Sequence, residues 1–157
     1  MSTSAMSVSA FHEGLREHLV NAIPHSRELG VIVQSVASDC VEIMLPYRDD
    51  WIGDALLGLI HPGVTTSLVD GTFGLAVMAR LGKMRSIATL DLRMDYQRPA
   101  LKGHALFCRA ECYRITPQIA FARATVWQSD ISNPVAFAQA AFMLGSARKR
   151  TAVKEPS

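Results

Sequence analysis

The chain has 157 residues, of which 49% are hydrophobic and 19% are charged, and its formal net charge is +2. This composition predicts one globular, soluble domain with a sizeable core and excludes a disordered chain. The weak basic balance argues against a nucleic-acid-binding protein. No window approaches the roughly 18 apolar residues of a membrane span, and the N-terminus lacks a signal-peptide pattern. We therefore expect a cytoplasmic protein without a nucleic-acid or membrane partner.

The three cysteines, Cys40, Cys108 and Cys112, are odd in number and lack the spacing of metal ligands. We expect all three to be reduced, as in the cytosol, with Cys108 and Cys112 as core thiols on one face of their element. Neither a metal ion nor a cofactor is expected.

The N-terminal part is expected to hold one short helix and a β-hairpin. Residues 1–9 are small and polar and predict a frayed tail. Residues 10–22 have apolar residues at helical spacing and stop before Pro24, which predicts a short amphipathic helix. Residues 29–36 and 40–47 are β-rich runs of strand length with a short joint between them.

Residues 62–81 form the longest helical candidate in the sequence. Pro62 suits the first helical position, and Gly82 suits the residue that ends the helix. Nearly every side of this helix is apolar or small, so we expect it to be buried on most faces. Gly71 and Gly74 in its interior predict a close approach to another backbone.

Four strands are expected after the helix, at residues 86–96, 104–115, 118–128 and 135–144. Short turns between consecutive strands predict antiparallel neighbours in chain order. Alternation in the first of these strands groups five residues on one face: Ile87, Thr89, Asp91, Arg93 and Asp95. A nearly all-apolar helix among six antiparallel strands predicts an α+β fold in which a curved sheet wraps around the helix. The domain is expected to cover residues 10–146, followed by a tail at 147–157.

Asp70 and His61 are candidate functional residues. Asp70 lies two turns inside the predicted helix, and no lysine or arginine lies three or four positions from it. A buried carboxylate without a partner is a functional candidate, whereas a solvent-facing aspartate is the simpler alternative. His61 precedes the helix N-terminus, where unpaired N–H groups suit a developing oxyanion. A local structural hydrogen bond is the alternative for this histidine.

The chain resembles hotdog-fold acyl-CoA thioesterases of the phenylacetate-degradation type. Those proteins share a Gly-x-x-His-Gly-Gly motif at the start of a central helix, an acid nine residues after the histidine, and a later strand that ends near Arg/Ser-Pro-Ala. This chain has Gly58, His61, Gly63 and Asp70 in that register, with the strand of residues 89–100 downstream. The resemblance covers about residues 25–145.

The resemblance implies hydrolysis of an acyl-CoA thioester at a site between the two subunits of a dimer. In the family, such dimers commonly associate into tetramers. Asp70 would act as general base or nucleophile, and Thr89 would help to hold the attacking water. His61 and Gly63 would lie at the carbonyl end of the substrate. CoA would enter only as part of the substrate.

Five further substrate contacts are expected, at Asp54, Pro62, Phe73, Arg98 and Lys102. The two basic residues would meet CoA phosphates, and Phe73 would line the acyl pocket together with Met78 and Leu81.

Two positions depart from the family pattern. Pro62 stands where the family has a glycine whose N–H polarises the thioester carbonyl, and proline has no N–H. Loss of one such donor typically costs about 10²–10³ in turnover. Asp54 and Ala55 stand where the family often has an asparagine, which donates as a carboxylate cannot. A donor from Gly63, a shifted loop or a different carbonyl position could compensate.

Two alternatives to a thioesterase remain at this point. The first is a non-catalytic or weakly active acyl-CoA-binding protein. The second is a hotdog dehydratase or hydratase, which needs a histidine and an acid across a narrow tunnel. His61 and Asp70 are nine residues apart, about 13 Å of helical rise, so within one chain they cannot act together.

Overall fold

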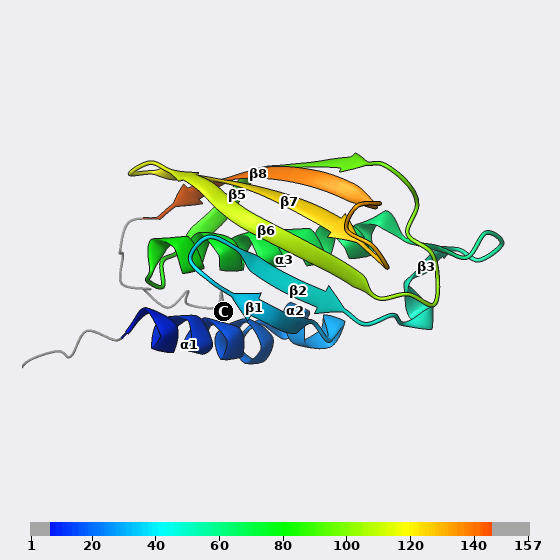
Figure 1. The fold of residues 1–157 in the computed structure, drawn as a ribbon, viewed down its shortest axis with the longest axis horizontal. Coiled ribbons are helices and arrows are strands. Elements are labelled where there is room, and N and C mark those ends of the chain that lie inside the picture. Colours follow the sequence, from blue (N-terminus) through cyan, green and yellow to red (C-terminus); the bar gives the residue numbers. More distant parts are fainter. Residues whose placement is uncertain (1–6, 146–157) are drawn as a thin grey trace, which may run out of the picture.

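The computed structural model describes residues 7–145, apart from the side chains of residues 18–21. A six-stranded antiparallel sheet curves around one long helix, and two shorter helices lie beside the edge of the sheet (Figure 1). The expected α+β fold is therefore confirmed. The predicted C-terminal tail, residues 147–157, lies outside the described residues.

The helices are α1 (Val8–Ala22), α2 (Pro24–Leu29) and α3 (Pro62–Leu81). Ser7 caps α1, because its side-chain oxygen accepts a hydrogen bond from the Ala10 N–H at 3.2 Å. Residues 7–9 therefore belong to the helix and its cap, and the prediction of a frayed tail is wrong there, while the rest of that predicted tail, residues 1–6, lies outside the described residues. Pro24 ends α1 but also begins α2, since proline fits the first helical position.

The strands are β1 (Ile32–Val36), β2 (Val41–Leu45), β3 (Ile52–Asp54), β4 (Leu59–Ile60), β5 (Ile87–Tyr96), β6 (Leu106–Ile115), β7 (Ile119–Trp127) and β8 (Ala136–Leu144). The main sheet has the order β1-β2-β6-β7-β8-β5. The short strands β3 and β4 form a separate hairpin that projects beyond the end of this sheet (Figure 1).

The position of β5 differs from the expected neighbour order. It pairs with β8 and forms an edge of the sheet, whereas chain order would place it beside β6. The connection from β5 to β6 does not turn back directly, because it runs along the β3–β4 hairpin. There the Ile60 N–H donates to the Ala100 carbonyl and the Lys102 N–H donates to the Gly58 carbonyl, each at 2.9 Å.

A β-bulge in β5 changes which side chains face the helix. Thr89 is opposite Phe142 and Asp91 is opposite Ala141, so Leu90 is the extra residue. Beyond the bulge the alternation is reversed. Thr89 therefore faces α3 while Asp91 faces outward, and the predicted grouping of these two on one face is wrong.

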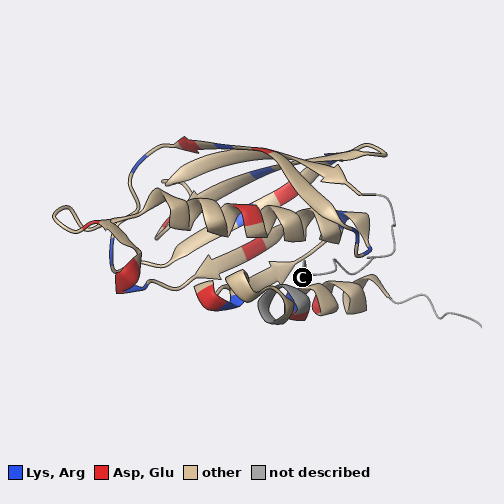
Figure 2. Ribbon diagram, turned by 180° about the vertical axis from the view of Figure 1, so that it is seen from behind, with Lys and Arg blue, Asp and Glu red and all other residues tan. Residues whose placement is uncertain are grey.

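The core lies between α3 and the inner face of the sheet. Phe73 is fully buried and meets Phe142 edge-on, with the ring centroids 6.3 Å apart. The inner faces of β7 and β8 are rich in buried alanine, which leaves room for the helix. Charge on α3 is confined to Asp70 and Arg80 (Figure 2).

Cys108 and Cys112 are buried free thiols in β6, which confirms their predicted place in the core. Burial raises the pKa of the Cys108 thiol to about 12. Among the helices of residues 7–145, none is long and apolar enough to cross a membrane.

Candidate functional site

The start of α3 is closed by His61. Its Nδ1 accepts a hydrogen bond from the Gly63 N–H at 3.0 Å, and its carbonyl accepts one from the Val64 N–H at 3.0 Å. The predicted local structural role of His61 is therefore present. It also means that the Gly63 N–H, a possible replacement for the donor missing at Pro62, already has a partner.

This bond determines which nitrogen of the neutral His61 ring can donate. Because Nδ1 accepts from Gly63, the proton of the neutral imidazole must lie on Nε2. His61 is exposed and lines two hollows, one on each side of the helix start. The ring thus offers an N–H donor at the position where Pro62 offers none.

Asp70 and Thr89 are brought together, as the resemblance implied. The Thr89 hydroxyl donates to Asp70 Oδ1 at 2.9 Å, joining α3 to β5. The expected burial of Asp70 is wrong, because its side chain is exposed in the single chain. The physical reason is the position of α3, which packs closely on β2, β6 and β7 and contacts β5 only sparsely.

The space between α3 and β5 is a cleft of about 660 Å³ that also reaches the joint between α1 and α2. Its end nearest the start of α3 is polar, with Thr66, Ser67 and Asp70 on the helix and Thr89 opposite, and we call this end the mouth because Asp70 and Thr89 are exposed. The rest of its lining is apolar or small: Leu15, Ile23, Gly71, Gly74, Leu75, Met78, Ile87, Leu92 and Phe142. His25 and Ser26 complete it at the α1–α2 joint.

A second hollow of about 460 Å³ follows the first turns of α3, where it touches Trp51, His61 and Gly63. His25 and Ser67 line both this hollow and the larger cleft. The two are therefore neighbours along the first turns of α3, between the helix start and Asp70. Sequence reasoning missed His25 and Ser67, because no local pattern shows that α2 lies beside α3.

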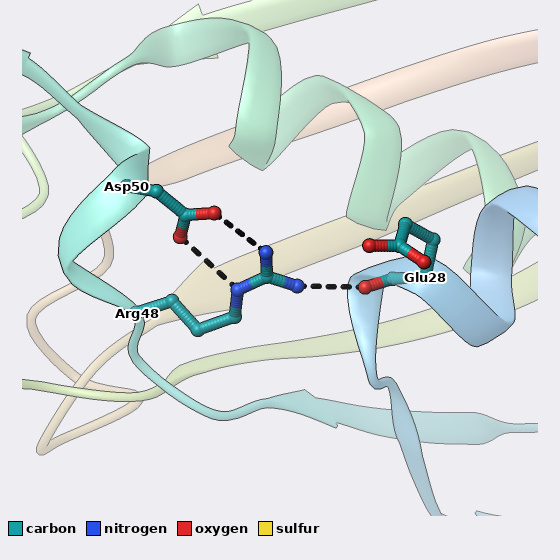
Figure 3. A network of polar contacts seen from close by, with 3 residues as sticks. All are labelled: Glu28, Arg48 and Asp50. Atoms are coloured by element: carbon teal, nitrogen blue, oxygen red, sulfur yellow. Dashed lines mark hydrogen bonds and ion pairs between the residues drawn. The ribbon is translucent and has the colours of Figure 1, made fainter.

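Arg48 joins Asp50, which lines the second hollow, to Glu28 of α2 (Figure 3). Its side chain is paired with Asp50 and donates from Nη1 to the Glu28 carbonyl at 2.7 Å. The guanidinium also lies 5.3 Å from the centre of the Trp51 ring. These contacts fix the loop before β3 against α2.

Within the described residues of the single chain, Gly71 and Gly74 do not approach another backbone, so that prediction is wrong for contacts inside the chain. A Cβ at Gly71 would meet no atom within 4 Å, and one at Gly74 would meet only Ile87 Cδ1, at 3.6 Å. Each glycine in a helix interior costs about 1 kcal/mol relative to alanine. Packing within the chain does not require them, and both line the cleft.

Phe73 does not line the cleft, since it points into the core on the other side of α3. Leu81 also packs against the core, whereas Met78 does line the cleft. The error at Phe73 arises because helical spacing alone does not show which apolar residues face the sheet.

Asp54 and Pro62 line a small hollow of about 240 Å³ between the β3–β4 hairpin and α3. Asp54 Oδ1 accepts a hydrogen bond from the Leu57 N–H at 2.9 Å, which shapes the hairpin. The Tyr96 hydroxyl donates to the Pro62 carbonyl at 3.0 Å and lies 3.2 Å from the Thr66 hydroxyl. Tyr96, which sequence reasoning missed, thus ties β5 to the first turn of α3.

Arg98 and Lys102 lie outside the cleft. Arg98 donates to the Asn133 carbonyl from Nε at 3.2 Å and from Nη2 at 2.9 Å. Lys102 is exposed, and its stem lies against Gly58, whose positive φ of 66° suits glycine. Within residues 7–145 no cluster of three or more His, Cys, Asp and Glu side chains could hold a metal ion.

A comparison with known protein families identifies the superfamily of this chain. The pattern of the thioesterase superfamily matches residues 57–135, which is half of the chain. This stretch contains the helix start, Asp70 and Thr89. The chain belongs to the thioesterase superfamily.

Solved structures show the same fold. A Pseudomonas aeruginosa protein is 34% identical with a TM-score of 0.75, and the match covers 85% of this chain and 98% of that one. The Escherichia coli PaaI protein of the phenylacetic acid degradation operon is 15% identical with a TM-score of 0.77, covering 89% and 97%. These neighbours confirm the hotdog fold.

A Halobacterium salinarum protein named as a "putative esterase" is 33% identical over 75 residues. The match spans 46% of this chain and 50% of the relative, so this chain covers about half the length of that curated protein.

Proposed function

We propose that this protein hydrolyses acyl-CoA thioesters, with Asp70 as the general base. The observation that carries the proposal is the bond of 2.9 Å from the Thr89 hydroxyl to Asp70 at the polar mouth of an apolar cleft. A carboxylate at the mouth can reach both water and a carbonyl whose acyl group lies in the cleft. Membership of the thioesterase superfamily supports this reading.

In the proposed step, Asp70 accepts a proton from water while the water oxygen attacks the thioester carbonyl carbon. The C–S bond then breaks, and the CoA thiolate takes up a proton. One thioester and one water thus become a carboxylic acid and free CoA. Thr89 occupies Oδ1 of Asp70 and leaves Oδ2 for the water.

The carbonyl oxygen needs a donor, and His61 Nε2–H is the group proposed for it. Pro62 has no N–H, and the Gly63 N–H is bonded to the His61 ring. Within one chain His61 and Asp70 are about 13 Å of helical rise apart. The donor that acts with Asp70 therefore comes from a second copy of the chain.

The edge position of β5 supports a site shared between two copies. Thr89 lies on this strand, whose outer side has no neighbour in the described chain. An unpaired edge strand presents free N–H and C=O groups that a second chain can reach. For the CoA phosphates, Lys102 is the better of the two basic candidates, because Arg98 already donates to Asn133.

A second function is favoured by one observation. Pro62 has no N–H and the neighbouring Gly63 N–H is engaged, so the family's backbone donor is absent from the helix start. A protein that binds acyl-CoA and hydrolyses it slowly or not at all would have the same cleft.

Release of CoA from a panel of acyl-CoAs, followed with a thiol reagent, tests the proposal. We expect Asp70→Asn to lower kcat by at least about 100-fold, as for removal of a general base. Asp39→Asn is the matched control, because Asp39 is exposed in the turn between β1 and β2, away from the cleft. An Asp70→Asn protein as active as the control would reject Asp70 as the base. Binding of acyl-CoA without turnover by the wild type would favour the binding protein.

A further inference from the structure

We propose that the cleft between α3 and β5 receives an uncharged acyl chain of medium length, and that Gly71 and Gly74 set the width of the part nearest the thioester. The proposal rests on the function proposed above and names the class of acyl group.

The distribution of polar groups along the cleft gives the direction of the chain. Among the side chains that the structure describes, the ionisable ones in the lining of the cleft are Asp70, at the mouth, and His25, which also lines the second hollow. Beyond them the lining is apolar, ending at Leu75, Met78 and Ile87. A carboxylate or ammonium group on the acyl chain would have no partner there, and its desolvation would oppose binding.

The helix provides a measure of length. From Asp70 to Met78 the cleft follows eight residues of α3, about 12 Å at 1.5 Å per residue. An extended alkyl chain advances roughly 1.3 Å per carbon, given C–C bonds near 1.5 Å. A chain of about eight to ten carbons therefore spans this distance.

The two glycines explain the width. Among the described residues, a Cβ at Gly71 would meet no atom within 4 Å and one at Gly74 would make only an ordinary contact with Ile87 Cδ1 at 3.6 Å, so a larger side chain at either position would extend into the cleft. Both lie between Asp70 and Met78, where the first carbons of the acyl chain would pass. Any larger residue there would occupy volume that the substrate needs.

A third wall of the cleft, beside those of α3 and β5, belongs to the part of the chain that the superfamily pattern does not cover. Leu15 and Ile23 close the cleft from α1 and its joint with α2. The pattern begins at residue 57, so it does not include these two residues. Acyl preference would then depend on α1 and the α1–α2 joint together with the α3 glycines.

The test compares kcat/KM for straight-chain acyl-CoAs from acetyl to dodecanoyl. We expect the wild type to prefer octanoyl- or decanoyl-CoA, and Gly71→Leu to lower kcat/KM for these by at least about tenfold relative to acetyl-CoA. Gly71→Ala is the milder second variant and should shift the preference in the same direction. Gly14→Leu, at an exposed glycine of α1 outside the cleft, should leave the preference unchanged.

The outcomes separate the two proposals. Hydrolysis with a chain-length preference that Gly71→Leu does not change would overturn the acyl site while the thioesterase function stands. A Gly71→Leu protein with altered oligomeric state by size-exclusion chromatography but unaltered preference would assign the cleft to a second copy of the chain, and would also overturn it. If the wild type hydrolyses no acyl-CoA, the acyl site is tested by calorimetry instead, which compares the binding of octanoyl-CoA to the wild type and to Gly71→Leu. Weaker binding by Gly71→Leu would support the acyl site alone, and equal binding would reject it.

Discussion

The side of α3 that faces β6 and β7 differs from the side that faces β5. Toward β6 and β7 the helix buries large apolar residues, among them Leu68, Val69 and Phe73. Toward β5 it presents Asp70 and Gly71, which are small or polar and open to the cleft. One helix thus supplies both the centre of the core and a wall of the candidate site.

Two neighbouring polar residues show the same difference. Thr72 is fully buried, and its hydroxyl donates to the Leu68 carbonyl at 2.7 Å, so its hydrogen bond is local to the helix. Asp70 takes its partner, Thr89, from a distant strand. The difference teaches that packing on one side holds the helix in place, so the other side need not contribute to stability.

The difference between the two sides of α3 predicts the largest loss of stability for a substitution at Phe73. We expect Phe73→Ala to lower the free energy of unfolding by about 3–5 kcal/mol, because the change leaves a cavity beside Phe142. Urea denaturation followed by circular dichroism measures this loss. Phe137→Ala is the matched control, since Phe137 is 46% exposed on the outer face of β8, and we expect it to cost less than about 1 kcal/mol. Equal losses in the two variants would mean that the faces of the molecule are not as distinct as described.

A second effect on stability concerns Cys108, which lies beside Thr72 on the buried side of α3. Burial raises the pKa of this thiol from 9.0 to about 12, so at alkaline pH the unfolded chain loses the proton first. The contribution of the thiol to stability is therefore complete below pH 9.0 and is lost as pH rises toward about 12. The slope is on the order of 1 kcal/mol per pH unit.

Urea denaturation at several pH values, compared between wild type and Cys108→Ala, measures this dependence. The variant should lose less stability than the wild type above pH 9.0. Parallel curves for the two proteins would contradict the burial of the thiol.

The smallest change in the free energy of unfolding is expected at Gly71. Whether this change is a gain or a loss is the informative result. Gly71→Ala should raise the free energy of unfolding by about 0.5–1 kcal/mol, because alanine favours the helix and has space there. Gly14→Ala in α1 should give a similar gain and serves as the control. Destabilisation by Gly71→Ala alone would mean that the open side of α3 is filled by another chain.

The first and last residues of α3 could be predicted from the sequence, because the residues that begin and end this helix act locally. Pro62 fits the first turn, and Gly82 adopts the left-handed conformation that ends the helix, at φ 64°. The place of β5 could not be predicted in this way. It depends on pairing with β8 and on a connection held by the β3–β4 hairpin, and both are contacts between distant segments.

Two residues of the candidate site, Asp70 and Thr89, could be predicted to lie together, but their environment could not. The pairing of Asp70 with Thr89 followed from the family resemblance, and the structure contains it. The exposure of Asp70 and the burial of Phe73 depend on how α3 lies over the sheet, which residue spacing along one helix does not show. His25 lies beside Ser67 only because α2 folds back toward α3.

The bulge at Leu90 has a consequence for insertions and deletions in β5. Deleting this one residue would give strict alternation with the present pairs kept, whereas pairing Leu90 in a regular ladder would exchange the inner and outer faces of the segment before it. Ala88 would then take the place opposite Asp70, and the hydroxyl of Thr89 would turn to the outer surface. The chemistry of this strand therefore depends on Leu90 being accommodated as a bulge, and a sequence alignment that ignores a single gap there would pair the wrong residues.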